Sequence, residues 1–320
     1  MKCILCERQN LVLLQTIKAE DLIALYKRMG VEVSHILTQD LCYWHCECCD
    51  LRFFALKDGE IPTGDNAFYT ELIKNSWYYM SEKNEYDFAI DFIKKGDRVL
   101  EVGCGAGIFG KRLQDFAQYT GLEFSTTAKE LAAQNGVNIQ NISVQEFAKS
   151  HKNSFDVACS FQVLEHTANP RSFLNAQIEC LRGNRGGGQN EHSQTSIEHS
   201  KNHQKLLIIA TPAEDSFLQY AVNGILNMPP HHISRYSDKV FEFIAKEFDL
   251  TLLQIYHEPI QPVHFDFYKS CMWAKIFLKT PLIDRGILRK FINKFGIVGK
   301  KFIEIPPEER GHTVIAVYGL

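Results

Sequence analysis

Short apolar runs alternate with longer amphipathic stretches through the middle of the chain, beginning after a turn signal at residues 94–97. Apolar runs of strand length predict strands at residues 98–103, 118–123, 156–161, 205–211 and 250–256, with a weaker one near 137–142 and a last one at 313–318. Helical spacing of apolar residues predicts helices at 109–116, 127–135, 170–181 and 238–248. This alternation predicts an α/β fold in which helices cover both faces of a doubly wound, mostly parallel sheet.

Two stretches depart from this alternation. Residues 183–203 are rich in Gly, Asn, Gln, Ser and His and nearly free of apolar residues, which predicts a solvated surface loop. Residues 273–302 carry eight basic side chains against one acid, with apolar residues between them, which is typical of basic amphipathic helices. Such helices can face an anionic membrane surface or a phosphate-bearing substrate, and an ordinary packing helix with a solvated basic face is the alternative.

The overall composition excludes several classes of protein. Of the 320 residues, 45% are hydrophobic and 23% are charged, as in ordinary globular proteins. The net charge of −3 provides no basic field, so nucleic acid is not expected as a partner. Residues 1–15 contain only a four-residue apolar run, unlike a secretory signal. No segment approaches the roughly 18–20 apolar residues that span a bilayer. We therefore expect a cytoplasmic protein.

Six of the ten cysteines fall within the first 49 residues. Cys3 and Cys6 form one Cys-x-x-Cys knuckle and Cys46 and Cys49 form another, so together they can give four thiolates to a tetrahedral zinc ion. The nearby residues that could replace one ligand are Cys42, His45 and Cys48. Four protein ligands close the coordination sphere, which predicts a structural zinc. Reduced cysteines in a small core without metal are the alternative.

The strongest chemical signal is a glycine-rich loop after the strand at 98–103. This strand runs into three alternating glycines, Gly103, Gly105 and Gly107, and then into a predicted helix. Glycines at such a turn let the backbone approach a ligand closely. The segment from Gly105 to Gly110 also matches the spacing of the dinucleotide fingerprint, so the loop alone does not identify the ligand.

Acidic residues around the loop narrow the choice of ligand. Glu101 lies two residues before the first glycine, where its carboxylate could reach the ammonium group of a methionine-type ligand. Glu123 ends the next strand, where it could accept hydrogen bonds from both ribose hydroxyls, and this suits NAD and S-adenosylmethionine equally. A third motif, Phe-Asp-Val-Ala-Cys-Ser-Phe-Gln-Val-Leu-Glu-His at residues 155–166, follows at the fourth strand.

Together these three motifs resemble those of the class I S-adenosylmethionine-dependent methyltransferases, in the same order and spacing over roughly residues 95–260. The resemblance implies a Rossmann-like sheet with an antiparallel last strand, S-adenosylmethionine as cofactor and S-adenosylhomocysteine as product. The cofactor-binding residues that it implies are Glu101, Gly103, Gly105, Gly107, Glu123, Phe124, Gln145 and Phe161. Phe124 would pack near the adenine, and Gln145 lies in the segment that would cap it.

Two alternatives to a methyltransferase are considered. In the first, a Rossmann-like domain has no catalytic activity and the glycines only pack a helix against a strand. In the second, the chain is a nicotinamide oxidoreductase, because Tyr79 and Lys83 match the Tyr-x-x-x-Lys pattern of one dehydrogenase class. That pair precedes the glycine loop instead of following it, which favours a chance match.

Candidate acceptor chemistry lies in the loop after the strand at 205–211. This loop contains Pro-Pro-His-His-Ile-Ser-Arg-Tyr at residues 229–236, which is similar to a segment of polysaccharide-cluster methyltransferases. We predict His231 or His232 as the general base or acceptor ligand, with Arg235 positioning an anionic group. His166 is a further catalytic candidate because it follows the fourth strand. An ordered loop packed on the domain is the alternative.

These observations divide the chain into four regions. They are a zinc-ribbon-like, zinc-binding module (1–56), a helical linker (57–95), an S-adenosylmethionine-binding domain (96–258 and 311–320) and a basic helical insertion (259–310). A cysteine-rich module ahead of such a domain resembles sugar-modifying methyltransferases. We expect a small-molecule acceptor, with methyl transfer to a hydroxyl of a sugar, nucleotide-sugar or lipid-linked intermediate. The alternatives are a deoxysugar C-methyltransferase and a non-catalytic nucleotide-binding module whose zinc unit recruits a partner.

Overall fold

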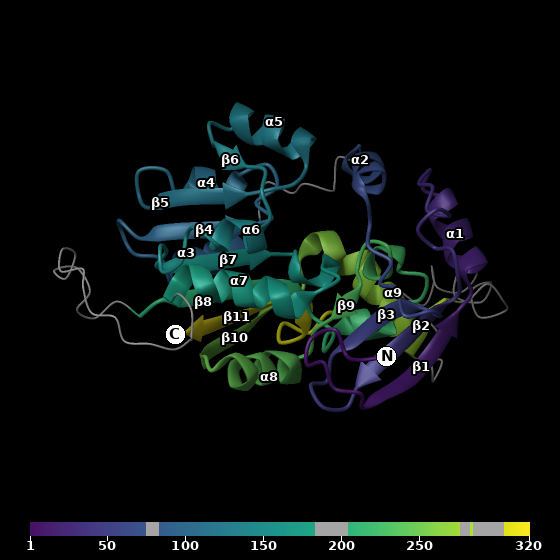
Figure 1. Ribbon diagram of the computed structural model, residues 1–320. Helices are drawn as coiled ribbons and strands as arrows, with labels where there is room; N and C mark the ends of the chain where they lie inside the picture. The colour runs from purple at the N-terminus through teal and green to yellow at the C-terminus, as the bar shows by residue number, and fades with distance from the viewer. Residues whose placement is uncertain (75–82, 183–203, 276–281, 284–303) are drawn as a thin grey trace.

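Two β-sheets organise the molecule in the computed structural model, which describes residues 1–74, 83–182, 204–275, 282–283 and 304–320 (Figure 1). The larger sheet has seven strands in the order β10-β11-β8-β7-β4-β5-β6. Their bounds are β4 Arg98–Val102, β5 Gln118–Leu122, β6 Ile139–Gln140, β7 Val157–Phe161, β8 Leu206–Pro212, β10 Thr251–Pro259 and β11 Arg310–Gly319. The pairs from β8 to β6 are parallel, whereas β11 is antiparallel to both β8 and β10. All seven predicted strands are present, and the predicted fold class is confirmed.

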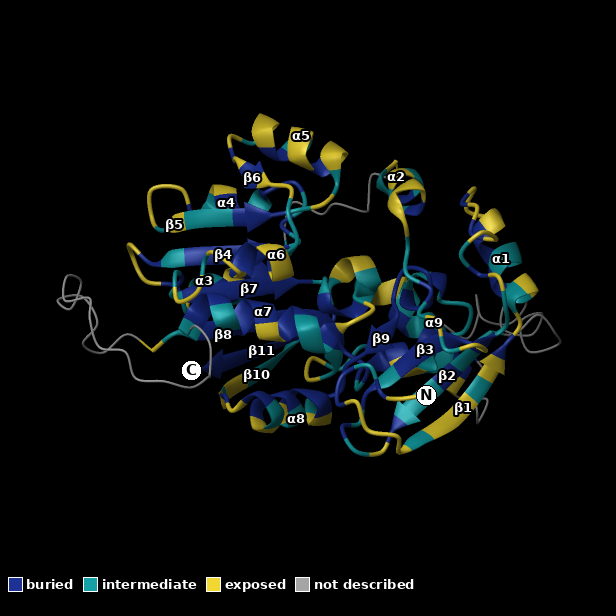
Figure 2. Ribbon diagram, viewed as in Figure 1, coloured by how far each residue is buried: buried dark blue, intermediate teal, exposed yellow. Residues whose placement is uncertain are grey.

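Helices cover both faces of this sheet. Their bounds are α3 Asn84–Ile90, α4 Ile108–Arg112, α5 Thr126–Gln134, α6 Val144–Ala148, α7 Pro170–Arg182 and α8 Asp238–Phe248. In β4, Leu100 and Val102 pack into the core that also takes in α6, α7 and α8. Val99 faces the opposite core, which contains α3 and α4. The strands of the middle of the sheet are consequently buried on both faces, while much of α5 is exposed (Figure 2).

A second, antiparallel sheet lies in the N-terminal part of the chain. It has the strand order β1-β2-β3-β9, with β1 Leu11–Ile17, β2 Leu41–Cys46, β3 Arg52–Leu56 and β9 Ser234–Arg235. This sheet was not predicted strand by strand. Its fourth strand comes from the segment after β8, and Arg52 pairs with Arg235 while Phe53 pairs with Ser234. Residues 1–56 are therefore joined to the larger sheet region by backbone hydrogen bonds.

The remaining elements are short. They are α1 Ala19–Lys27, α2 Asn66–Ile73, α9 Phe265–Lys275 and the 3₁₀ helices η1 Leu164–His166, η2 Phe217–Tyr220, η3 Ile225–Asn227 and η4 Pro262–His264. The predicted linker (57–95) contains α2 and α3, and the predicted insertion (259–310) contains α9. Three predicted features lie wholly or partly outside the described residues. They are the loop 183–203, Tyr79 of the pair of Tyr79 with Lys83, and most of the basic stretch 273–302. Over the described residues, no helix has the length and apolar content needed to cross a bilayer.

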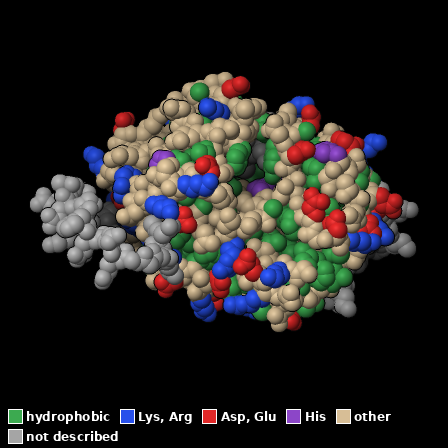
Figure 3. Space-filling model, viewed as in Figure 1, with side chains coloured by type: hydrophobic (Ala, Val, Ile, Leu, Met, Phe, Trp, Pro, Cys, Tyr) green, Lys and Arg blue, Asp and Glu red, His purple; other side chains and the backbone are tan. Residues whose placement is uncertain are grey.

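The hydrophobic core also crosses the predicted boundary at residue 56. One core cluster contains Cys3, Leu5, Cys46 and Phe53 together with residues of α7 and α8. A second cluster packs α1, the end of β1 and α2 against Ile225 and Met228 of the segment between β8 and β9. The surface is hollowed between the N-terminal part and the rest of the molecule, and a histidine side chain is visible there (Figure 3).

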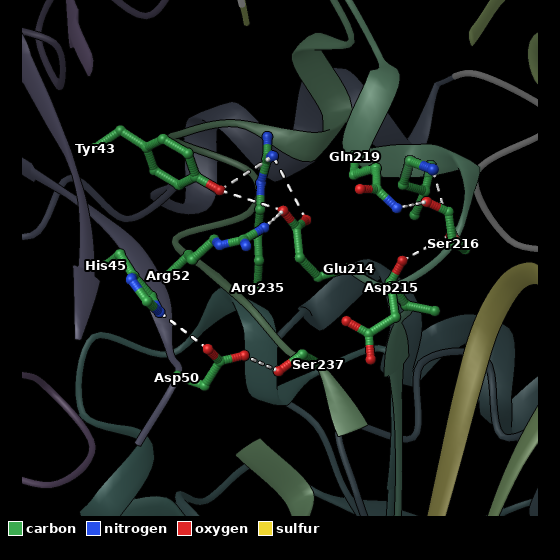
Figure 4. Close-up of polar contacts among 12 residues, drawn as sticks. Tyr43, His45, Asp50, Arg52, Glu214, Asp215, Ser216, Gln219, Arg235 and Ser237 are labelled. Atoms are coloured by element: carbon green, nitrogen blue, oxygen red, sulfur yellow. Dashed lines mark hydrogen bonds and ion pairs between the residues drawn. The ribbon is translucent and has the colours of Figure 1, made fainter. Parts of the chain in front are cut away.

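A buried ion-pair network closes the junction between the two sheets (Figure 4). Glu214, in the loop after β8, lies 2.6 Å from Arg52 of β3 and 3.6 Å from Arg235 of β9. The guanidinium of Arg235 also donates to the Asn227 carbonyl at 2.6 Å and lies over the ring of Tyr43. Only 4% of the Arg235 side chain is exposed. The expectation that Arg235 positions an acceptor anion is therefore wrong, because its charge is used inside the protein.

Replacing Glu214 with Gln should lower the free energy of unfolding by about 3 kcal/mol, because it leaves the charge of Arg235 buried without its carboxylate. Denaturant unfolding of the full chain measures this change. The matched control is Asp87→Asn, which removes the exposed partner of Arg112 and should cost less than about 1 kcal/mol. Equal losses in the two variants would contradict the structural role of Glu214.

Candidate active site and cysteine cluster

The glycine loop leaves the end of β4 in a tight turn. Gly103 donates its N–H to the Leu122 carbonyl of β5 at 2.8 Å, which holds the loop against the neighbouring strand. The φ angle of Gly103 is +74°, and a Cβ at this position would lie 2.4 Å from Val163 Cγ2. The backbone at Gly105 and Gly107 also has positive φ, 50° and 70°. Only glycine adopts such a run without strain, so the loop has the open backbone that close approach of a nucleoside requires.

Glu101 lies in β4, two residues before the first glycine of the loop, and is 1% exposed. Tyr119 of β5 donates its hydroxyl to the Glu101 carboxylate at 2.5 Å. Burial raises the pKa of Glu101 to about 8, because the surroundings disfavour the charged form, although the hydrogen bond from Tyr119 opposes this. A cationic ligand beside this carboxyl group would favour its ionised form, and the ionised carboxylate is the stronger hydrogen-bond acceptor. The geometry is compatible with the predicted interaction with an ammonium group.

Glu123 follows β5, and its carboxylate is fixed by two backbone donors. Gly105 donates to one oxygen at 3.0 Å and Ser125 donates to the other at 2.8 Å. Each carboxylate oxygen can accept more than one hydrogen bond, so both can still receive a ribose hydroxyl. Phe124, the next residue, is 67% exposed, and Asn141 donates to the carbonyls of Glu123 and Phe124. An exposed ring beside a fixed carboxylate fits the predicted nucleoside position.

The two other predicted cofactor residues differ in position. Gln145 is exposed in the first turn of α6, the helix that follows β6. Phe161, at the end of β7, is only 4% exposed and packs against Phe109 at 4.9 Å and Tyr86 at 5.2 Å between ring centroids. Phe161 therefore supports the loop from the core, and its direct contact with a cofactor stays a prediction.

The three predicted catalytic histidines meet at the carboxyl edge of the sheet. His166 ends η1, directly after β7, and His231 and His232 lie in the segment that leads to β9. Their possible ligand atoms all lie within 4.8 Å of one another. The ring centroids of His166 are 4.6 Å from His231 and 4.9 Å from His232. Two parts of the chain that are 65 residues apart thus form one histidine cluster, defined as His166, His231 and His232.

The electrostatic surroundings keep these histidines neutral. Burial lowers the pKa of His166 to about 4 and lowers those of His231 and His232 well below the usual value. Glu165, which the sequence analysis did not select, is fully buried next to the cluster. Its position in the Leu-Glu-His part of the third motif could have indicated a role at the site. The sequence does not reveal that its carboxyl group is buried beside the histidines.

The four predicted metal ligands also come together. The sulfur atoms of Cys3 and Cys49 are 3.5 Å apart, as are those of Cys6 and Cys46, and all four lie within 4.8 Å of one another. Cys42 and Cys48 are not in this group, and His45 instead contacts Asp50 at 3.0 Å. The cysteine cluster, defined as Cys3, Cys6, Cys46 and Cys49, is buried.

The two knuckles of this cluster have the same backbone geometry. In the first, the N–H of Glu7 donates to the Cys3 carbonyl and the N–H of Cys3 donates to the Arg8 carbonyl. The second repeats both bonds, from Asp50 to Cys46 and from Cys46 to Leu51. The residue after each second cysteine has positive φ, 60° at Glu7 and 62° at Asp50. This repeated turn directs two thiols from each knuckle to one point, and S···S distances of 3.5 Å suit a tetrahedral zinc.

Comparisons with known proteins identify the class of the catalytic domain. A family model described as "Methyltransferase domain" matches residues 77–255, which is more than half of the chain. The chain therefore belongs to this methyltransferase family.

The similar curated proteins include the ubiquinone biosynthesis O-methyltransferase of Klebsiella pneumoniae (strain 342), which is 34% identical over 101 residues, 29% of this chain and 40% of that protein. The protein of the same name from Cronobacter sakazakii is 34% identical over 94 residues, 27% of this chain and 39% of that protein. The chain thus matches about two fifths of the length of these relatives. A solved S-adenosylmethionine-dependent methyltransferase from Archaeoglobus fulgidus aligns with 79% of this chain and 100% of its own, at a TM-score of 0.51 and 15% identity, which shows a shared fold.

The raised pKa of Glu101 can be tested without ligand, through the pH dependence of the stability of the folded protein. Its carboxyl group would stay protonated in the folded protein up to about pH 8, whereas in the unfolded chain it ionises above about pH 4.5. The unfolded state therefore binds fewer protons between these values, and the contribution of Glu101 to stability is lost as the pH rises from 4.5 to 8.

Relative to the wild type, Glu101→Gln should become more stable across this range, by up to about 1.4 kcal/mol per pH unit. Denaturant unfolding at several pH values measures the difference. Glu130→Gln, on the exposed face of α5, is the control and should show no such trend. A constant difference between wild type and Glu101→Gln would contradict the raised pKa.

Proposed function

We propose that this chain transfers a methyl group from S-adenosylmethionine to a small-molecule acceptor, at a hydroxyl of a sugar, nucleotide-sugar or lipid-linked intermediate. One observation carries the proposal: the predicted cofactor and catalytic residues all follow strands at the carboxyl edge of the parallel part of one sheet. They are the glycine loop after β4, Glu123 after β5, His166 after β7 and the two histidines after β8. Ligands bind at this edge in open α/β sheets. A nucleoside site and a cluster of proton-accepting groups therefore share one side of the fold.

The bound cofactor supplies a methyl group on a positively charged sulfur. The chain has to orient the two reactants and accept the acceptor's proton. Glu123 would hold the ribose hydroxyls, and Glu101 would face the methionine end of the cofactor. A neutral imidazole can take a proton from a hydroxyl, and the lowered pKa of His166 and of His232 keeps both rings neutral near pH 7.

Oxygen is the methylated atom that we favour, because the relatives reported above are named O-methyltransferases. A deoxysugar C-methyltransferase is the second candidate, and it is favoured by the cysteine cluster beside the catalytic domain. A nucleotide-binding module without activity is the third. A lipid-linked or phosphate-bearing acceptor stays a proposal based on the basic stretch 273–302, as does a contact of that stretch with a membrane surface.

The first test uses S-adenosylmethionine labelled in its methyl group, incubated with the purified chain and a cell extract. Label in water-soluble anionic molecules would support a nucleotide-sugar acceptor, and label in butanol-soluble lipid would support a lipid-linked one. The position of the label in the isolated product separates O-methylation from C-methylation. If the chain binds S-adenosylhomocysteine but labels no fraction, the non-catalytic alternative is favoured.

Variants separate cofactor binding from methyl transfer. Glu123→Gln should raise the dissociation constant for S-adenosylhomocysteine by about tenfold or more, because charge-assisted hydrogen bonds to the ribose are weakened. Calorimetric titration measures this, with Glu130→Gln as the matched control that should bind like the wild type.

His232→Ala should lower turnover by roughly 100-fold or more with little change in cofactor affinity. Unchanged turnover in His232→Ala and in the corresponding His166 and His231 variants would remove the histidine cluster from the mechanism.

We further propose that the cysteine cluster holds one structural zinc ion. The spacing of the four sulfurs and the repeated knuckle turns support this, and zinc bound there would stabilise residues that link the N-terminal sheet to α7.

Cys46→Ser should therefore lose the thiolate-bound zinc and lower the midpoint of thermal unfolding. Cys42→Ser, a change in the same strand outside the cluster, should retain the metal. Elemental analysis of the purified variants measures zinc per chain. Cys46→Ser with wild-type metal content and stability would contradict the assignment.

A further inference from the structure

A second group of potential metal ligands lies in the described part of the chain, away from the cysteine cluster. It is the histidine cluster, and Glu165, which precedes His166 in η1, lies beside two of its three rings. The Glu165 Oε1 atom lies 3.8 Å from His166 Nε2 and 3.9 Å from His232 Nε2. Three imidazoles thus lie together, and one carboxylate lies next to two of them.

The hydrogen bonds of the three rings orient them for ligation. Carbonyl oxygens lie next to Nδ1 in each ring, at 2.6 Å from His166 to the His231 carbonyl, 2.8 Å from His231 to the Leu226 carbonyl and 3.1 Å from His232 to the Asn227 side chain. A carbonyl oxygen can only accept, so Nδ1 carries the hydrogen and Nε2 carries the lone pair. Metal-binding histidines commonly donate their other ring N–H to a carbonyl in this way.

Glu165 provides an independent indication of a cation. Its side chain is fully buried, and among the described residues neither carboxylate oxygen has a hydrogen-bond partner. A buried carboxyl group without a partner is unfavourable. The buried carboxyl of Glu214, by contrast, has the guanidinium of Arg52 at 2.6 Å. A cation between Glu165 and the rings would provide the missing partner and hold the carboxylate in its charged form.

We propose that His166, His231, His232 and Glu165 bind a divalent first-row transition-metal ion. Imidazole nitrogen together with carboxylate oxygen suits Zn²⁺, Fe²⁺, Mn²⁺, Co²⁺ or Ni²⁺ better than Ca²⁺ or Mg²⁺, which prefer oxygen ligands alone. Ligand atoms around such an ion lie roughly 3.3 Å apart, given bonds of about 2.0–2.1 Å. The present separations are longer, at 3.8 and 3.9 Å from Glu165 to two of the rings and up to 4.8 Å among the rings, so these side chains would have to move together when the ion binds.

The site explains what the proposed function leaves open, namely which acceptors fit. This part of the inference rests on that function. An ion at the carboxyl edge of the sheet would bind the hydroxyl oxygen of the acceptor and lower the pKa of that hydroxyl, and its proton would pass to solvent water because the three imidazoles are then ligands. Without the ion, a neutral imidazole would accept that proton instead. The acceptors that fit best are then molecules in which the methylated hydroxyl lies beside a second oxygen, so that both can approach the ion.

Zinc binding by the full chain, without cofactor or acceptor, tests the site independently of methyl transfer. After equilibration with Zn²⁺ and removal of free metal, wild-type protein should hold two zinc ions per chain, one on thiolates and one on the histidine cluster. His232→Gln and Glu165→Gln should each hold one. His151→Gln, which alters a histidine stacked on Phe147 in a different part of the molecule, is the matched control and should hold two.

Substitution with Co²⁺ identifies which site is lost, because only the thiolate site gives sulfur-to-metal charge-transfer absorption. That absorption should be unchanged in His232→Gln. Imidazole nitrogen resonances of wild-type protein provide a readout that does not depend on variant folding: a second equivalent of Zn²⁺ should shift the Nε2 signals of His166, His231 and His232. One zinc per chain in wild-type protein, or unshifted Nε2 signals, would overturn the proposal, even if methyl transfer is observed.

Discussion

The backbone pairing of β3 with β9 is the constraint on which the rest of the active region depends. The segment between β8 and α8 has to serve two sheets, because it leaves the carboxyl edge of the larger sheet and supplies the last strand of the smaller one. The histidines lie on this segment just before β9. The Ile233 N–H donates to the Glu165 carbonyl at 2.7 Å, and the Phe54 N–H donates to the Ile233 carbonyl at 2.9 Å. The spacing between His166 and the other two histidines is thus set by bonds to both parts of the molecule.

The N-terminal part consequently holds the segment that carries His231 and His232. Tyr26 of α1 donates its hydroxyl to the carbonyls of Ile225 and Met228, and the Gly64 N–H donates to the Pro230 carbonyl. These bonds fix the segment before the histidines, while the Glu214 network fixes the segment on either side of β9. A zinc ion in the cysteine cluster would act on the histidine cluster through the shared core, since Cys3, Cys46 and Cys49 pack in one core with Leu164 and Tyr236.

The sequence predicted those features that depend on local patterns. Apolar periodicity located every strand of the larger sheet, and α8 begins and ends where predicted. The helix predicted at 109–116 stops at Arg112, where the chain turns so that Asp115 takes a positive φ of 65°. The small sheet was not resolved into strands, because its fourth strand has two residues and pairs with a segment about 180 positions away, which no local pattern records.

The same distinction holds at the candidate site. The positions of Gly103 and Glu123 follow from their distance to predicted strands, whereas the roles of Arg235 and Phe161 depend on burial by residues distant in sequence.

The strand β9, which pairs with β3, also bears on how such proteins can be recombined. A hybrid that joins residues 1–56 to another catalytic domain would leave the edge of β3 unpaired unless residues 213–237 travel with it. The unit of exchange in this architecture is therefore discontinuous, consisting of two pieces of chain separated by most of the larger sheet.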